Sequence, residues 1–171
     1  MITFLSGGTE TAALIQGFRQ ILYDREIAVV ANTAEDLQVS GGHFAPDIDT
    51  AIFLFAGILD TGRWWGIKGD TYTTHTYLPK VGGGEPFPIG DRARAVQIAR
   101  AGLLSRGLSL TEAVEAQCRS LSIGAAILPV TDGDAATFID TGTELLPLFD
   151  YWMTADPATE VREVLRAAPE P

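Results

Sequence analysis

Hydrophobic residues fall into short continuous runs and helically spaced faces, and this pattern predicts an α/β fold. Residues 2–6 form an apolar run that ends in Gly7-Gly8, and residues 27–31 form a β-branched run that ends in a polar turn. Between them, residues 11–23 carry apolar side chains at helical spacing. Strand, glycine loop, helix and strand in this order are the opening of a parallel α/β sheet.

The rest of the chain continues this pattern up to a charged, Pro- and Ala-rich end in which no closing element is predicted. A helix that is apolar nearly all round is expected to be well buried, and the long Gly-, Thr- and Trp-rich segment after it is typical of a functional loop. The predicted elements are a helix at 49–59, a loop at 60–90 with a short helix at 71–78, helices at 91–105 and from a capping box at 109–112, and strands at 127–128, 137–139 and 145–149.

Length and charge restrict the classes of function. The 171 residues are enough for one domain with a single core, spanning 1–171. The formal net charge of −10, with only two lysines, disfavours nucleic acid and anionic membrane as partners. The absence of eighteen consecutive apolar residues disfavours a membrane span, the first residues lack a basic signal region, and the single Cys118 cannot form an internal disulfide. These features predict a cytoplasmic protein.

Two polar loops follow the first two predicted strands. Ser6-Gly7-Gly8-Thr9 allows backbone N–H groups to approach a phosphate at a helix amino terminus. The turn that begins at Asn32 offers an amide, a hydroxyl and two carboxylates at a position where open α/β sheets bind ligands. Both loops are equally compatible with a purely structural turn, and the residues alone leave this open.

Asp47 and Asp49 stand two residues apart, just before the buried helix. Two carboxylates at this spacing can converge on Mg²⁺, which takes oxygen ligands and bridges carboxylates to substrate phosphates. Either residue can instead cap the helix.

Arg92, in the first turn of the next long helix, is unfavourable against the helix dipole, which suggests a phosphate or carboxylate partner. A nearby Asp would also explain it.

The remaining candidates favour structural roles. Trp64-Trp65 can cover an aromatic ring or pin the loop to the core. His43 and His75 lack metal-ligand spacing, and Cys118 falls on an apolar helix face. The sequence contains no catalytic triad order, nucleophile elbow or Walker loop. Carboxylates, arginine and backbone amides are therefore the catalytic inventory, which suits metal-assisted phosphoryl transfer.

Seven motifs resemble, in order and approximate spacing, those of the 2-phospho-L-lactate transferase (CofD) family, over residues 1 to about 165. They are Phe4-Leu-Ser-Gly-Gly-Thr9, Val29-Val-Ala-Asn-Thr33, Pro46-Asp-Ile-Asp-Thr50, Trp65-Gly-Ile-Lys-Gly-Asp-Thr71, Ile89-Gly-Asp-Arg92, Ile127-Leu-Pro-Val-Thr-Asp132 and Tyr151-Trp152.

The resemblance implies a Rossmann-like three-layer fold with a mostly parallel sheet, and a role in coenzyme F-420 biosynthesis. A phospho-acid, 2-phospholactate or phosphoenolpyruvate, would pass from its guanylyl-activated form to the deazaflavin Fo. The products would be GMP and F-420-0 or dehydro-F-420-0, and Mg²⁺ would be required.

The resemblance also implies the site residues. Asp49 and Arg92 match positions that bind the deazaflavin. Asp47 and Asp49 match the catalytic acidic pair near the metal. Gly7, Gly8 and Thr9, together with Asn32, match loops that line the substrate cleft.

Two departures from the family pattern change the expectation. After Thr9 the family usually continues Gly-Thr-Pro-Lys, whereas this chain has Glu10-Thr-Ala-Ala13, which places a carboxylate where a phosphate would bind. The chain also ends before a later Gly-Pro-Ser-Asn-Pro segment, so it is expected to lack the carboxy-terminal half. We therefore expect low activity alone, and a homodimer or a complementing carboxy-terminal chain as partner. The first alternative is a non-catalytic regulator of the same fold that binds nucleotide sugars. The second is a degraded remnant with no function.

Overall fold

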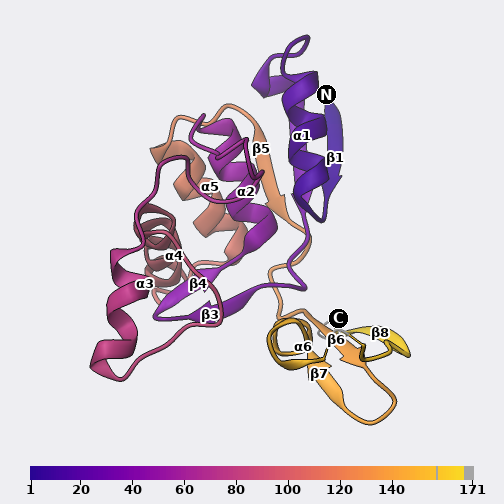
Figure 1. Ribbon diagram of the computed structural model, residues 1–171. Coiled ribbons are helices and arrows are strands. Elements are labelled where there is room, and N and C mark those ends of the chain that lie inside the picture. Colours follow the sequence, from indigo (N-terminus) through magenta and orange to yellow (C-terminus); the bar gives the residue numbers. More distant parts are fainter. Residues whose placement is uncertain (157, 168–171) are drawn as a thin grey trace.

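A three-stranded parallel sheet, sheet A, lies along one side of the body in the computed structural model, which describes residues 1–156 and 158–167 (Figure 1). Its strands lie in the order β1-β2-β5, with Phe4 opposite Val29 and Val29 opposite Ile127. These three side chains are buried. The strands are β1 (Ile2–Ser6), β2 (Ile27–Ala31) and β5 (Ala126–Pro129). The α/β class and the parallel sheet predicted from the sequence are confirmed.

Four main helices pack beside the sheet and beside one another. Helices α1, α2 and α5 contact strands of sheet A, and α4 packs on α5. The helix α5 begins at the predicted capping box. The Ser109 Oγ accepts a hydrogen bond from the Glu112 N–H at 3.2 Å, and the Glu112 carboxylate accepts one from the Ser109 N–H. The helices are α1 (Thr9–Phe18), α2 (Pro46–Phe55), α4 (Asp91–Leu104) and α5 (Leu110–Ser120).

Helix α2 is buried along its whole length, as its apolar pattern predicted. It begins three residues earlier than expected because Pro46 sits at the first helical position, where its fixed φ is already helical. Neither Asp47 nor Asp49 caps it; the N-cap residue is Ala45, without a side-chain bond. Helix α1 is shorter than predicted, and Arg19 after its end bonds to Asp24.

Three parts of the fold were not predicted. Strands β3 (Leu37–Val39) and β4 (Gly42–Phe44) form a hairpin whose two turn residues, Ser40 and Gly41, both have positive φ. The strand predicted at 145–149 is β7 (Leu145–Pro147) followed by the helix α6 (Leu148–Thr154). A further strand, β8 (Glu163–Ala167), closes an antiparallel sheet on β6 (Ala136–Asp140), where no closing element was expected.

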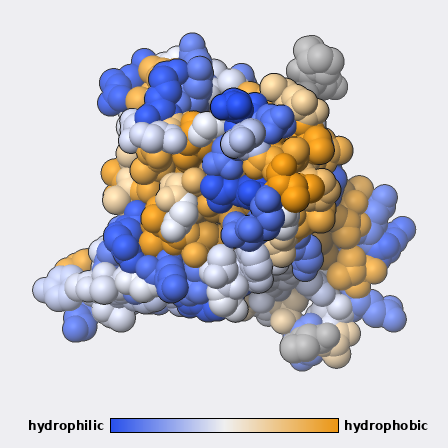
Figure 2. Space-filling view, turned by 90° about the horizontal axis from the view of Figure 1, so that it is seen from above, coloured by the Kyte–Doolittle hydropathy of each residue, from blue (hydrophilic) through white to orange (hydrophobic). Residues whose placement is uncertain are grey.

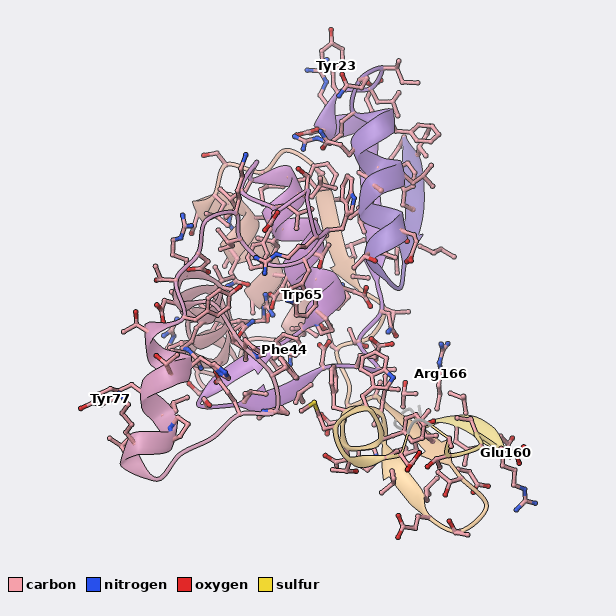
Figure 3. The ribbon with its side chains drawn as sticks, in the orientation of Figure 1. Tyr23, Phe44, Trp65, Tyr77, Glu160 and Arg166 are labelled. Atoms are coloured by element: carbon pink, nitrogen blue, oxygen red, sulfur yellow. The ribbon has the colours of Figure 1, made fainter. Side chains whose placement is uncertain are left out.

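Aromatic side chains join this carboxy-terminal sheet to the body. Phe149 of α6 packs on Phe44 of β4 and on Phe87, with ring centroids 5.9 and 5.3 Å apart. Trp65 also packs against Phe44, with ring centroids 5.8 Å apart (Figure 3). Trp64 and Trp65 both pack partly buried against the core, so they hold the long loop onto the body.

Two aspartates join residues 70–74, in the middle of the long loop, to the start of α4 by reciprocal hydrogen bonds. The Asp70 carboxylate accepts from the Arg92 and Ala93 N–H groups, both at 3.0 Å, and so caps α4 in place of the N-cap residue Gly90. In return, the Asp91 carboxylate accepts from the Thr71 hydroxyl and from the first N–H groups of the short helix α3 (Thr73–Tyr77). We call this pair the aspartate clamp.

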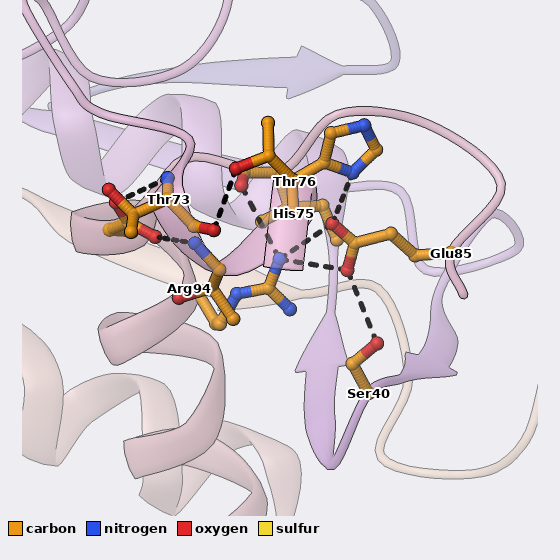
Figure 4. A network of polar contacts seen from close by, with 9 residues as sticks. Ser40, Thr73, His75, Thr76, Glu85 and Arg94 are labelled. Carbon is orange, nitrogen blue, oxygen red and sulfur yellow. Dashed lines mark hydrogen bonds and ion pairs between the residues drawn. The ribbon is translucent and has the colours of Figure 1, made fainter. Parts of the chain in front are cut away.

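Glu85 forms a second anchor for the loop (Figure 4). Its carboxylate is almost fully buried and contacts Arg94 of α4 at 2.7 and 2.8 Å, His75 of α3 at 2.6 Å and Ser40 at 3.2 Å. Burial opposes ionisation of Glu85, but these partners outweigh it and hold its pKa below the usual value. The loop that follows α3, through the 3₁₀ turn Leu78–Val81, is therefore tied to the body at both ends.

No helix among the described residues is long and apolar enough to cross a membrane. Hydrophobic residues nevertheless reach the surface in several places, visible between hydrophilic ones in Figure 2.

The aspartate clamp gives a testable prediction. A Cβ added at Gly90 would lie 2.6 Å from the Asp70 Cγ, so Gly90→Ala must displace the carboxylate that caps α4. We expect the free energy of unfolding to fall by about 1–3 kcal/mol, as for a lost helix cap with added steric conflict. Urea denaturation measures this. Gly84→Ala is the matched control, because a Cβ there meets no atom within 4 Å; equal effects of both changes would contradict the clamp.

Candidate functional site

The carboxyl ends of β1 and β2 bring together four residues that were predicted to line a site. The Gly8 N–H donates to the Asp47 Oδ1 at 2.7 Å, which joins the loop after β1 to the first turn of α2. A Cβ on Gly7 would lie 3.9 Å from the Asn32 Cβ, so the second loop is directly alongside. Gly8 has φ of +133°, which L side chains rarely adopt. The glycine loop is therefore needed for the approach to Asp47.

Asp47 carries a free oxygen in this cluster. Its Oδ2 is buried and has no hydrogen-bond partner in residues 1–156 and 158–167. Burial raises the pKa of Asp47, while the Gly8 N–H and the Asn32 side chain lower it in part. A buried carboxylate oxygen without a partner is unfavourable unless a ligand or ion satisfies it.

Asp49 has different partners, which are part of a buried polar network centred on Arg100. The Arg100 guanidinium is fully buried and donates to Asp49, to Gln117 at 3.0 Å and to the backbone oxygen of His43 at 3.1 Å. Gln97 donates to the second Asp49 oxygen at 3.0 Å. Arg100, on α4, thus links α2, α5 and β4. Both oxygens of Asp49 are engaged within the protein.

Asp47 and Asp49 therefore do not converge. Residues two apart on an α-helix are rotated by about 200°, and each carboxylate faces its own partners. No group of three or more metal-binding side chains lies together in the described part of the chain. The free Asp47 oxygen fits a magnesium ion that keeps most of its ligands as water and substrate oxygens. Asp49, held by Arg100 and Gln97, does not fit as a second ligand.

Arg92 lies at the start of α4 with its side chain about half exposed. Its NH2 group donates to the backbone oxygen of Lys68 at 2.7 Å, and its Nε lies 3.5 Å from Asp70. The nearby Asp considered in the sequence analysis is thus Asp70. Asp49 and Ala93, the residue after Arg92, line the same narrow pocket under Trp65.

Thr9 and Glu10 begin α1 beside this cluster. A Cβ on Gly8 would lie 3.1 Å from the Glu10 Oε2, so this carboxylate reaches back over the glycine loop. The amino terminus of α1, which would attract a phosphate, already has a negative side chain beside it.

Glu35, after β2, is also close to Asp47. Burial and the charge of Asp47 raise the pKa of Glu35, and Arg166, which extends from β8 in Figure 3, opposes this in part.

Sequence reasoning missed a polar cavity of about 420 Å³ next to the cluster. Thr33, Asp36 and His43 line it, and each has a buried polar atom without a partner among the described residues. Burial raises the pKa of Asp36 to about 8, and burial with the charge of Arg100 lowers the pKa of His43 to about 4. His43 was predicted to be a polar loop residue, and no spacing signal pointed to its place in β4.

The turn after β5 also lines the cavity. Asp132 accepts from the Thr111 N–H in the first turn of α5, and the exposed Asp134 lies at the cavity wall. The cavity offers a neutral imidazole, a hydroxyl and carboxyl groups, which suits a ligand rich in hydrogen-bonding groups.

Asp36 gives a prediction for stability against pH. Because the folded-state pKa lies above the unfolded value, this group's contribution to stability is full below the unfolded pKa and is lost as the pH rises toward about 8. Asp36→Asn removes this loss. The free energy of unfolding of the variant, relative to that of the wild type, should therefore rise by at least about 1.4 kcal/mol when the pH is raised from 5 to 8.5. Urea denaturation at the two pH values measures the difference. The control is Asp134→Asn, because Asp134 lies at the same cavity but is exposed. Its free energy of unfolding relative to the wild type should rise by less than about 0.5 kcal/mol over the same pH range.

Comparisons with known proteins agree on one family. The family model described as 2-phospho-L-lactate transferase CofD matches residues 2–169. A 2-phospho-L-lactate transferase of Methanocorpusculum labreanum is 45% identical over 97% of this chain and 55% of its own length. One of Methanospirillum hungatei is 41% identical over 99% of this chain and 57% of its own length, and one of Methanosarcina barkeri is 42% identical over 90% and 49%. The chain spans about half the length of these curated relatives.

Proposed function

Because the chain belongs to the 2-phospho-L-lactate transferase CofD family, we propose that it forms the amino-terminal part of a phospho-acid transferase site. The donor is 2-phospholactate or phosphoenolpyruvate joined to GMP, and the acceptor is the deazaflavin Fo. The terminal ribityl hydroxyl of Fo attacks the activated phosphorus and forms a new oxygen–phosphorus bond. The bond to GMP breaks, GMP leaves, and the hydroxyl proton passes to solvent.

The observation that supports this proposal best is the cluster of Gly8, Asn32 and Asp47 at the tips of sheet A. Ligands of open α/β sheets bind beyond the carboxyl ends of the strands, which is where this cluster lies. The free Oδ2 of Asp47 would hold the proposed magnesium ion. Bound there, the ion would supply neutralisation of phosphate charge. Gly7 and Asn32 would contribute backbone and amide hydrogen bonds to the substrate, while Gly8, whose N–H is taken by Asp47, would allow the close approach of the substrate to the loop.

Asp49 and Arg92 take different parts in the proposal. Arg92 is accessible and retains donors beyond its bond to Lys68, so it binds and orients Fo. Both oxygens of Asp49 are held by Arg100 and Gln97, so Asp49 acts by fixing α2 against α4, the helix that carries Arg92. Substitution of Asp49 would leave Arg100 as an uncompensated buried charge, at a cost of about 3–5 kcal/mol. Loss of binding in an Asp49 variant therefore does not separate recognition from folding.

Fo binding tests the proposal. We expect Arg92→Ala to weaken binding of Fo, followed by Fo fluorescence in a titration, by about tenfold or more, since a charge-assisted hydrogen bond is worth about 1.5–3 kcal/mol. Unfolding by urea should change little, because Arg92 is exposed. The matched control is Arg119→Ala, an arginine of similar exposure on α5. Wild-type binding of a uridine nucleotide without Fo would instead support the nucleotide-sugar-binding regulator.

Transfer itself is expected to be weak or absent for the chain alone. Glu10 lies over the glycine loop and would repel the donor phosphate. We expect no F-420-0 above background when the purified 171-residue chain is incubated with Fo, Mg²⁺ and the guanylyl-activated phospho-acid. Chromatographic detection of F-420-0 measures this, and turnover by the chain alone would contradict the expectation.

A further inference from the structure

One face of the carboxy-terminal sheet is covered, and β8 forms an edge of that sheet. The strands lie in the order β7-β6-β8, and the register sets Arg166 opposite Thr137 and Val164 opposite Ile139. Directly opposite residues of an antiparallel pair carry their side chains on the same face. Thr137 and Ile139 are both buried, whereas every residue of β8 is exposed. Arg166 therefore belongs to the covered face of the sheet and lies at its open edge.

The side chain of Arg166 extends toward the loops that end β1 and β2. In Figure 3 it points from β8 toward the body of the protein. Its positive charge also reaches Glu35, in the loop after β2, where it opposes the rise in the pKa of Glu35 that burial and Asp47 cause. The direction of the side chain and the effect of its charge thus agree on the same place.

Three carboxylates meet at these loops. Glu10 reaches back over Gly8, and Asp47 accepts from the Gly8 N–H with one oxygen, while its other oxygen is buried without a partner in the described part of the chain. Glu35, close to Asp47, is the third. A phosphate or carboxylate that enters here is repelled by each of these groups, and the formal net charge of −10 adds to the repulsion. A bound anion therefore requires a cation at this place.

Arg166 is a cation that remains available there. Arginines of the body are already engaged by carboxylates of the protein, as in the pairs of Arg19 with Asp24, Arg94 with Glu85 and Arg100 with Asp49. Within residues 1–156 and 158–167, the guanidinium of Arg166 has neither a hydrogen bond nor an ion pair. Its donors are therefore open to a ligand.

We propose that Arg166 binds the anionic group, phosphate or carboxylate, of the donor's phospho-acid, so that the carboxy-terminal sheet supplies a substrate-binding residue to the cluster at the tips of sheet A. A guanidinium matches either group with two parallel hydrogen bonds. The inference rests on the proposed function, because the ligand class is that of the proposed donor.

An ion pair between Arg166 and Glu35 alone is the competing explanation. The two roles are compatible, since a guanidinium has five N–H donors and can bind a substrate oxygen while it faces Glu35. They differ in consequence, because an exposed ion pair adds little to stability and does not recognise a ligand. Regular structure positions Arg166, since β8 pairs with β6 along its whole length and Phe149 joins this sheet to the body.

Binding of small anions by the 171-residue chain tests the proposal. Phosphoenolpyruvate, inorganic phosphate and pyruvate are titrated separately, with Mg²⁺ and at low salt, by isothermal titration calorimetry. We expect Arg166→Gln to weaken binding of phosphoenolpyruvate by about tenfold or more, as for a lost charge-assisted hydrogen bond. A matching loss for inorganic phosphate assigns Arg166 to the phosphate, and a matching loss for pyruvate assigns it to the carboxylate.

Arg162→Gln is the matched control, because Arg162 stands just before β8 with an exposed side chain near Asp140. It should bind phosphoenolpyruvate like the unsubstituted chain. Glu10→Gln should bind more tightly, since it removes one of the three repelling charges. Circular dichroism checks that each variant is folded.

Two results overturn the proposal. One is equal affinity of Arg166→Gln and Arg162→Gln for phosphoenolpyruvate. The other is the absence of binding by both the unsubstituted chain and Glu10→Gln. The assay contains no Fo, so its failure is distinct from the failure of Arg92→Ala to weaken Fo binding.

Discussion

The buried guanidinium of Arg100 is the interaction on which the arrangement of the body depends. A fully buried charge is tolerated only when its donors are satisfied, and Arg100 finds its partners on α2, α5 and β4. These elements must therefore keep one mutual position for the charge to remain compensated. That position places Asp47 against the Gly8 N–H on one side of α2, and Asp49 under Trp65 on the other. The geometry of the candidate site follows from this constraint.

The sequence predicted the elements whose hydrophobic pattern is strong. The run Ile2–Ser6, the all-round apolar α2 and the capping box at Ser109 were each recognisable because burial or backbone bonding there depends on local residue type. The hairpin of β3 and β4 was missed because its strands have three residues each, too short for a period to appear. Strand β8 was missed because all of its residues are exposed and it carries no apolar alternation.

The sequence indicated which candidate residues lie together better than it indicated their geometry. Motif positions indicated Gly7, Gly8, Asn32 and Asp47, and these residues do lie together. Spacing alone suggested that Asp47 and Asp49 act as a pair, but the helix separates them, and Asp49 meets an arginine fifty-one residues away in sequence. The buried residues of α4 include Arg94, Gln97 and Arg100, and no apolar spacing marks these polar positions as the inward face. A buried network of this kind depends on distant partners, which no local pattern contains.

The aspartate clamp has a consequence for how such proteins vary. Asp70 binds the start of α4, and Asp91 binds the segment that follows Asp70, so the chain leaves and rejoins the body at one place. The geometry at this place does not depend on the length of the loop between Thr71 and Asp91. A loop whose ends are already fixed together costs little extra entropy when it lengthens. Within this loop, Gly82-Gly83-Gly84 precedes Glu85 and takes no part in the hydrogen bonds that anchor Glu85 to the body. Insertions and deletions can accumulate there while the helix that bears Arg92 stays in place.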